Sequence, residues 1–211
     1  YENLKTDLEA KYEKLRDQSK AKESLLVQTK SSELRYRTLL ASLKQQHQAV
    51  VNEERAYEEQ IRKKLAQENK LSASVGAFAW PLLNRTITAT FHDPDYPFRN
   101  VFEHSGLDIR ASQGTPVRAS AAGYVARAKI CGAASCYAYI LIVHTGNLST
   151  LYGHLSRVDV QADQFVNKGE IIGLTGGKHG TVGAGPFVTV PHLHFEVRAN
   201  GIPVDPVGYL E

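Results

Sequence analysis

Glycine and proline divide this chain into two unlike parts. Residues 1–75 contain neither, whereas all 16 glycines and all 8 prolines lie in the rest of the 211-residue chain. The first part is rich in Lys, Glu, Gln, Ala and Leu, which are good helix formers, and nothing in it ends a helix. We therefore expect one long helix over residues 1 to about 72. The boundary is expected near Gly76, which gives a helical region 1–75 and a second region 76–211.

Apolar residues recur along this helix at mixed spacings, as in a coiled coil. The residues that fit one heptad seam are Leu43, Val50, Tyr57 and Leu71, with Lys64 interrupting it. Such a stripe has to be covered by another apolar surface. The candidates are a second copy of the chain, the other half of the helix folded back at residues 16–24 or 28–32, and the C-terminal region.

From Trp80 onward, short alternating or β-branched segments are separated by turn residues, and Pro81 cannot continue a helix. The expected strands are 86–91, 116–119, 123–128, 139–143, 148–152, 170–174 and 192–197. Many short strands without a convincing helix indicate a compact, mainly antiparallel β domain, either a barrel or a sandwich. The chain as a whole is therefore expected to be α+β.

Charge and hydropathy limit the classes of partner. The formal net charge of +3 is small and Lys and Glu are interspersed, so no nucleic-acid-binding surface is expected. No signal peptide and no run of about 18 apolar residues is present. The chain has no Met and begins within a helical pattern, so we expect a fragment or a processed form, and earlier removal of a targeting segment is compatible with this.

Cys131 and Cys136 lie close together between strand-like segments. A disulfide at a hairpin tip would suit an oxidising compartment, and two free thiols are the alternative. A zinc knuckle is not favoured, because no second pair of ligands lies nearby.

Residues 191–198 alternate apolar and polar, so His192 and His194 should project from one face of a strand. Upstream, His104 and Asp108 offer a nitrogen and an oxygen ligand, and Gly106 between them would let the backbone bend. Together with His194 they give the two histidines and one carboxylate of a catalytic zinc whose fourth position is open. Ordinary hydrogen-bonded histidines are the alternative.

Four other histidines of the second region need a role. His154 lies where a strand enters a turn, and beside a zinc site it is expected to orient a water or take its proton, although a core residue is the alternative. His92 and His179 are expected to be plain loop histidines, although both could approach a metal. His144 is expected to serve in hydrogen bonding at a strand end.

A set of motifs in this second region resembles, in order, the lysostaphin-like (LytM-type) zinc metallopeptidases, which cut peptide crosslinks in bacterial peptidoglycan. The matching segments are 80–81, 104–108, 114–117, 123–125, 150–156, 166–173, 192–197, 200–206 and 209–210. The resemblance covers about residues 80–211. The helical region resembles, more weakly, the coiled coils that often precede such domains.

The resemblance implies that His104, Asp108 and His194 bind one zinc ion. It makes His154 and His192 the catalytic histidines, which accept a proton from the attacking water and stabilise developing charge.

It also implies a zinc endopeptidase acting on peptidoglycan stem peptides outside the cytoplasm, in the periplasm or cell envelope, either tethered to a membrane or secreted. A membrane or divisome partner bound through the coiled coil and a homodimer are further candidate interactions.

The alternative function is a regulator of cell-wall hydrolases, either non-enzymatic or an enzyme held inactive by its helix. Relatives used as regulators typically lack metal ligands, and all five site residues are present here, which favours the enzyme. The helix is interpreted either as a spacer or as a lever that positions or covers the active site. Loops 91–103 and 176–189 are longer than in many relatives and are expected to border the substrate groove.

Overall fold

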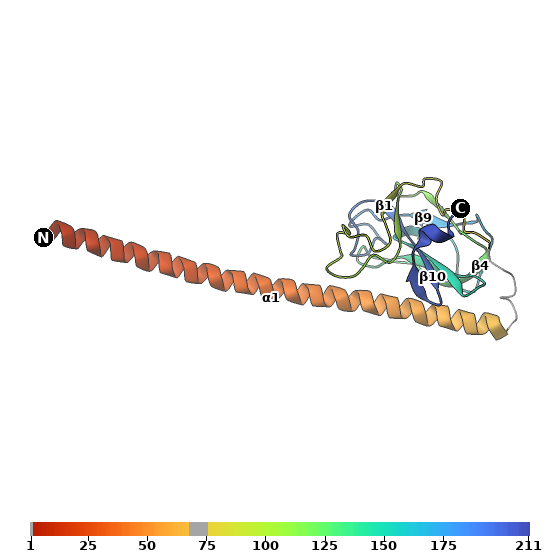
Figure 1. Ribbon diagram of the computed structural model, residues 1–211, viewed down its shortest axis with the longest axis horizontal. Helices are drawn as coiled ribbons and strands as arrows, with labels where there is room; N and C mark the ends of the chain where they lie inside the picture. Colours follow the sequence, from red (N-terminus) through yellow and green to blue (C-terminus); the bar gives the residue numbers. More distant parts are fainter. Residues whose placement is uncertain (1, 68–75) are drawn as a thin grey trace. The chain divides into compact units, whose positions relative to one another are not determined.

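The N-terminal region is one uninterrupted helix, α1 (Glu2–Gln67), in the computed structural model (Figure 1). The structure describes residues 2–67 and 76–211, and the side chains from residue 16 onward. The expected long helix is confirmed. The fold-back alternative is wrong, because α1 continues through residues 16–24 and 28–32, where no Gly or Pro interrupts it. The expected end near residue 72 and the seam residue Leu71 lie outside the described residues.

The chain forms two compact units, Tyr1–His47 and Gln48–Glu211. Residues 48–67 of α1 therefore belong to the same unit as the β domain. Within this unit, Ile61 and Leu65 are buried against Leu141 and Leu151 of the sheet. Of the three surfaces that could cover the apolar stripe, the C-terminal region is the one that packs on residues 48–67. The coiled coil and the boundary near Gly76 stay predictions.

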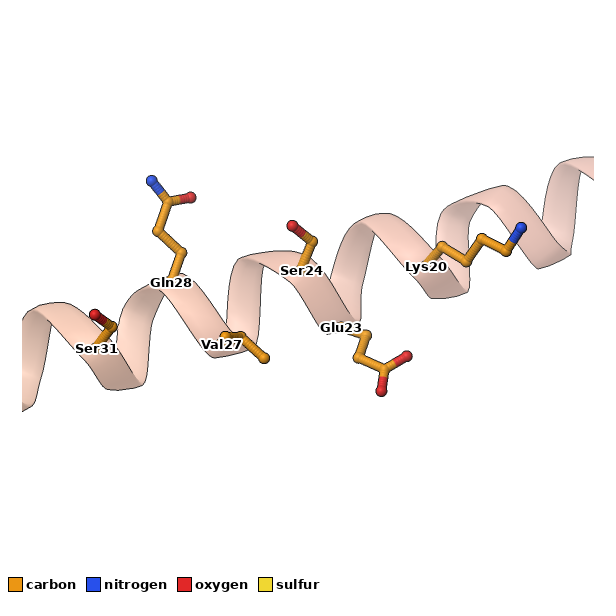
Figure 2. Close-up of a pocket in the computed structure, with 6 residues that line it drawn as sticks. All are labelled: Lys20, Glu23, Ser24, Val27, Gln28 and Ser31. Carbon is orange, nitrogen blue, oxygen red and sulfur yellow. The ribbon is translucent and has the colours of Figure 1, made fainter.

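In the first unit, α1 presents large apolar side chains to solvent. They are Leu25, Leu26, Val27, Leu34, Tyr36 and Leu39. Figure 2 shows a shallow depression lined by Lys20, Glu23, Ser24, Val27, Gln28 and Ser31. Since all of its lining comes from one stretch of a single helix, this depression is open helix surface. Within the described residues, no helix combines the length and apolarity that a membrane crossing requires.

The second unit contains two antiparallel sheets. The larger has the order β1-β2-β10-β6-β5-β4-β8, with β11 also pairing with β10, and the smaller has the order β3-β9-β7. The strands of the larger sheet are β1 (Ile87–Ala89), β2 (Leu107–Arg110), β4 (Gly123–Lys129), β5 (Tyr139–Val143), β6 (Leu148–Gly153), β8 (Phe165–Val166), β10 (His192–Ala199) and β11 (Ile202–Val204). Those of the smaller sheet are β3 (Pro116–Arg118), β7 (Leu155–Val158) and β9 (Ile171–Thr175), and a 3-10 turn, η1 (Pro206–Tyr209), follows β11.

The expected helix-then-β architecture is confirmed, and each expected strand is present with small shifts at its ends. The sequence did not predict β2, β7, β8 and β11. None of these four is longer than four residues, so each offers little sequence by which to tell a strand from a loop.

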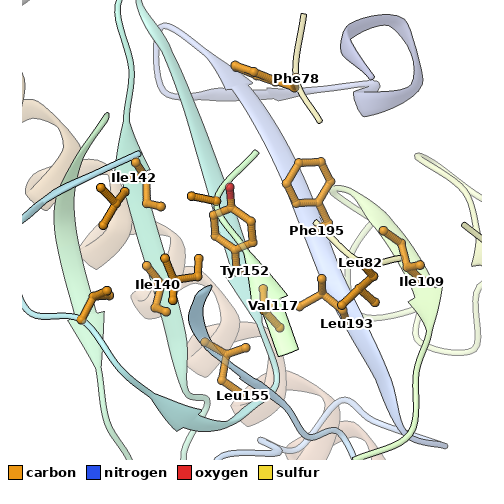
Figure 3. Close-up of a cluster of buried hydrophobic side chains, with 14 of the residues drawn as sticks. Phe78, Leu82, Ile109, Val117, Ile140, Ile142, Tyr152, Leu155, Leu193 and Phe195 are labelled. Carbon is orange, nitrogen blue, oxygen red and sulfur yellow. The ribbon is translucent and has the colours of Figure 1, made fainter. Parts of the chain in front are cut away.

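A hydrophobic core joins the two sheets (Figure 3). It includes Leu193 and Phe195 of β10, Ile140 of β5, Val117 of β3 and Leu155 of β7. Because side chains alternate across a strand, the polar residues of β10 project from the opposite face of the larger sheet. Residues 48–67 of α1 pack on this second face.

A disulfide joins Cys131 to Cys136 in the connection between β4 and β5, as one of the two alternatives predicted.

Candidate metal centre

Strand register brings the expected metal ligands together. β2 and β10 are antiparallel neighbours, and His194 lies directly opposite Asp108. His104 stands just before β2, where the chain passes very close to β10. A Cβ atom at Gly106 would lie 2.3 Å from the carbonyl oxygen of Phe195. Gly106 is therefore needed for this close approach of two backbones.

The three side chains meet at one point. His104 Nε2 lies 3.1 Å from Asp108 Oδ1 and 3.2 Å from His194 Nδ1, and His194 Nδ1 lies 2.9 Å from Asp108 Oδ1. All three residues are at least nine-tenths buried. They form a group whose donor atoms could hold one metal ion.

Hydrogen bonds on the far side of each ring fix the tautomers. His104 Nδ1 lies 2.6 Å from the carbonyl oxygen of Thr90, and His194 Nε2 lies 3.1 Å from Glu196 Oε1. Each of these nitrogens therefore carries a hydrogen, so in the neutral rings the lone pairs lie on His104 Nε2 and His194 Nδ1. Two lone pairs and a carboxylate oxygen that face each other repel unless a cation lies between them. Two nitrogens and one oxygen are a donor set that suits zinc with an open position.

The local charge also favours a cation. Burial alone would raise the pKa of Asp108, but the adjoining rings of His104, His194 and His192 favour its charged form and hold the pKa well below its usual value. Burial alone would lower the pKa of His194, but the carboxylates of Asp108 and Glu196 outweigh burial and raise it to about 10. The carboxylates of Asp108 and Glu196 would likewise stabilise a divalent ion bound at His194 Nδ1 in place of the proton that this raised pKa implies.

His154 and His192 lie beside this group. Their ring centroids are 4.7 Å apart, and the ring of His154 is 6.0 Å from that of His194. His154 adopts a left-handed backbone conformation with φ of 57° between β6 and β7, which is rare for a residue with a side chain and frequent at functional sites. The structure thus brings together all five residues that the sequence singled out.

The two rings are held by backbone carbonyls. His154 Nδ1 donates to Ala184 at 2.6 Å and His192 Nδ1 to Val190 at 2.7 Å, so each Nε2 has a free lone pair. Burial, with smaller contributions from His192 and His194, lowers the pKa of His154 to about 3. His154 is therefore neutral at physiological pH, with an unprotonated Nε2.

Three further histidines of the second unit lie outside this group of five. His92 and His179 are exposed, and neither belongs to the metal-donor group found among the described residues. His144 is buried at the end of β5 and bonds the carbonyl oxygen of Ala122 and Thr150 Oγ1, each at 2.8 Å.

Sequence reasoning missed several residues that support the site. Glu196 and Arg198 follow His194 at alternate positions of β10, so the period of two could have found them. Ser105 donates to the same Glu196 oxygen as His194. Tyr96 stacks on the ring of His104, with centroids 4.3 Å apart. No local pattern indicates Tyr96, because its loop has no periodicity.

Loops 91–103 and 176–189 contact each other through aromatic rings. Phe187 contacts Phe98 and Phe102, with centroid distances of 5.5 Å and 4.8 Å. Their expected role at the border of a substrate groove stays a prediction.

Comparison with known proteins agrees with this geometry. Residues 102–206 match the family model described as peptidase family M23. The DD-carboxypeptidase/endopeptidase Mpg of Neisseria meningitidis serogroup B is 36% identical over 144 residues, which cover 67% of this chain and 31% of that protein. The peptidoglycan DD-endopeptidase ShyA of Vibrio cholerae is 36% identical over 107 residues, which cover 51% of this chain and 23% of that protein.

A crystal structure of a zinc-containing peptidase from Vibrio cholerae superimposes with a TM-score of 0.51 and 31% identity, covering 63% of this chain and 40% of that one. The chain spans less than a third of the length of the two curated relatives. The resemblance noted in the motifs is confirmed, and the β domain of this chain belongs to peptidase family M23.

Proposed function

We propose that this protein is a zinc-dependent endopeptidase that hydrolyses peptide crosslinks of bacterial peptidoglycan. The observation that carries the proposal is the convergence of His104 Nε2, Asp108 Oδ1 and His194 Nδ1 beside two further histidines. The names of the relatives, a DD-endopeptidase and a DD-carboxypeptidase/endopeptidase, support peptidoglycan as the substrate class. When bound, zinc would polarise the scissile carbonyl and lower the pKa of the attacking water.

In this proposal the protein's own groups move the protons. His154 Nε2 accepts a proton from the attacking water, while the carbonyl of Ala184 holds the opposite side of the ring. His192 Nε2 lies 3.6 Å from Asp108 Oδ1. Once its ring is protonated, His192 stabilises the negative charge that develops on the oxygen of the scissile carbonyl. A proton has to reach the leaving amine from one of these two rings.

We also propose that the protein acts outside the cytoplasm, in the periplasm or cell envelope, either tethered to a membrane or secreted. The Cys131–Cys136 disulfide supports an oxidising compartment. A homodimer, or a membrane or divisome partner bound through the helix, is a further proposal that the exposed apolar side chains of residues 25–39 support. Sedimentation of the full chain at several concentrations tests the homodimer.

The function is tested by incubating the full chain with crosslinked muropeptides, with a zinc chelator, and again after zinc is restored. Cleavage should stop with chelation and return with zinc. His154→Ala should lower kcat by about 100-fold or more, because a general base is lost. His47→Ala, at a histidine of the first unit, is the matched control and should retain full activity.

The same experiment, with zinc binding measured as well, distinguishes the endopeptidase from the alternative function, a regulator of cell-wall hydrolases. A wild-type chain that binds zinc and cleaves no crosslink would be the non-enzymatic or autoinhibited regulator. An autoinhibiting helix would have to be held on the β domain. Residues 48–67 form ion pairs with Arg127, Lys129, Asp163 and Arg198 of that domain.

A further inference from the structure

A line of buried polar side chains runs from the metal centre to α1. His194 Nε2 bonds Glu196 Oε1 at 3.1 Å, and Arg198 Nε donates to Glu196 Oε2 at 2.6 Å. Arg198 Nη2 then donates to Glu54 Oε2 of α1. Glu54, Glu196 and Arg198 are only 3%, 4% and 2% exposed. Alternate residues of β10 supply three members of the line, and the helix supplies the fourth.

We propose that Glu54 is a positioning residue of the metal centre: through Arg198 and Glu196 it fixes the orientation of the His194 imidazole. The inference rests on the proposed function of His194 as a metal ligand. It makes residues 48–67 of α1 part of the active centre, in addition to any role as spacer or lever.

The physical reason lies in the geometry of Arg198. Its planar guanidinium is held between two carboxylates, one from β10 and one from α1, which fixes the long side chain at both ends. Without Glu54, Glu196 would be the one charged partner of Arg198 among the described residues, and the two side chains could rotate together. One oxygen of Glu196 accepts the hydrogen bond from His194 Nε2. If the Glu196 carboxylate rotated, the imidazole ring of His194 would therefore turn with it.

Attachment of the helix does not require this network. Ile61 and Leu65 already pack on the sheet, and Glu53 pairs with Lys129 at 3.0 Å. A buried ion pair adds little net stability compared with apolar residues of similar volume. Glu54 is therefore better explained by its effect on Arg198 than by adhesion of α1.

The test compares Glu54→Ala, Glu54→Gln and Glu58→Ala in the full chain. Glu58 is the matched control, because it is 2% exposed on the same helix and its carboxylate accepts from Arg62 of that helix at 2.9 Å. The readouts are Zn2+ affinity by competition with a chromophoric chelator, the visible spectrum of the Co2+-substituted protein, and kcat and KM on crosslinked muropeptides.

Glu54→Ala should weaken Zn2+ binding about 10-fold and alter the Co2+ spectrum, since loss of a group that orients a ligand has effects of this size. kcat should fall with little change in KM. Glu54→Gln keeps an oxygen acceptor for Arg198 and should recover most of the affinity. Glu58→Ala should leave the affinity and the spectrum unchanged.

Equal losses of Zn2+ affinity in Glu54→Ala and Glu58→Ala would overturn the inference. If Glu54→Ala does not fold, Arg198→Lys decides, because Lys keeps the charge but cannot bridge both carboxylates. Arg198→Lys should weaken Zn2+ binding about 10-fold. Unchanged Zn2+ binding in this variant would overturn the inference. If the wild type cleaves no crosslink while Glu54→Ala still alters the Co2+ spectrum, the positioning role stands and the proposed function fails.

Discussion

Four histidines of the site differ in what holds their rings. The Nδ1 atoms of His104, His154 and His192 all donate to backbone carbonyls, which leaves Nε2 free in each. His194 presents Nδ1 to the metal group, and its Nε2 bonds the side chain of Glu196. A backbone carbonyl moves only with the chain, whereas a carboxylate can rotate. His194 is therefore the member of the donor group whose ring orientation distant side chains can change.

At the same scale, Gly153 leaves space for the Tyr137 hydroxyl. A Cβ atom at Gly153 would lie 1.9 Å from Tyr137 Oη, and the Tyr137 ring is 5.0 Å from that of His154. Gly153→Ala should destabilise the fold by about 1–3 kcal/mol through overpacking. Denaturant unfolding measures this loss. Adding Tyr137→Phe should recover part of it, whereas Gly208→Ala, with no atom near its Cβ, should cost little.

His144 predicts a pH dependence of stability. Burial lowers the pKa of His144 from 6.5 to about 4. Because its folded-state pKa is depressed, the unfolded chain binds more protons between these values. The stabilisation is fully present above pH 6.5 and is lost as the pH falls towards 4, by about 3 kcal/mol in all.

Unfolding free energies of the wild type and of His144→Gln between pH 4 and 8 check this prediction. The variant should lose part of the slope between pH 6.5 and 4, and exposed His179→Gln should keep it. Identical slopes in the wild type and His144→Gln would contradict the assignment.

At the scale of elements, the disulfide loop supports His154 through a second loop. Gly183 and Gly185 donate backbone hydrogen bonds to Ala133 and Ala134, at 3.2 Å and 2.9 Å. The residue between the two glycines is Ala184, whose carbonyl holds His154 Nδ1. The connection between β4 and β5 thus fixes the partner of a proposed catalytic histidine.

The double variant Cys131→Ala/Cys136→Ala should lose about 2 kcal/mol of stability, since a short closed loop is released. It should also lower kcat, because Ala184 is then less firmly placed. Thermal unfolding and muropeptide kinetics measure the two effects. Zn2+ affinity should stay within about 2-fold, because the metal donors do not contact this loop. An unchanged kcat would show that the loop does not act on His154.

At the scale of the whole molecule, α1 is a part of the second unit over residues 48–67. Leu65 is 2% exposed, whereas Leu39 of the first unit is 59% exposed. Leu65→Ala should destabilise the second unit by about 2–3 kcal/mol, and Leu39→Ala should change stability by less than about 0.5 kcal/mol. Chemical denaturation of both full-length variants checks the difference. Equal effects would mean that residues 48–67 do not stabilise the β domain.

Much of the architecture and of the candidate site was predictable, because both depend on short-range pattern. Helix formers without Gly or Pro predict α1, and alternation predicts β5 and β10. The same alternation places His192 and His194 on one face. The four unpredicted strands each offer little sequence by which to tell a strand from a loop, and the turn that holds Tyr96 against His104 has no pattern.

The long helix and the β domain were predictable from helix propensity and alternation, and the donor set of His104, Asp108 and His194 from their residue types and the resemblance of the surrounding motifs to the LytM-type peptidases. Only the tertiary structure decided which surface covers residues 48–67 and which residues hold His194 in place. Glu54 and Arg198 are 144 positions apart, and their pairing exists only because α1 packs on the face of the sheet that carries the site. Contacts of this kind depend on docking between distant segments, which no local pattern specifies.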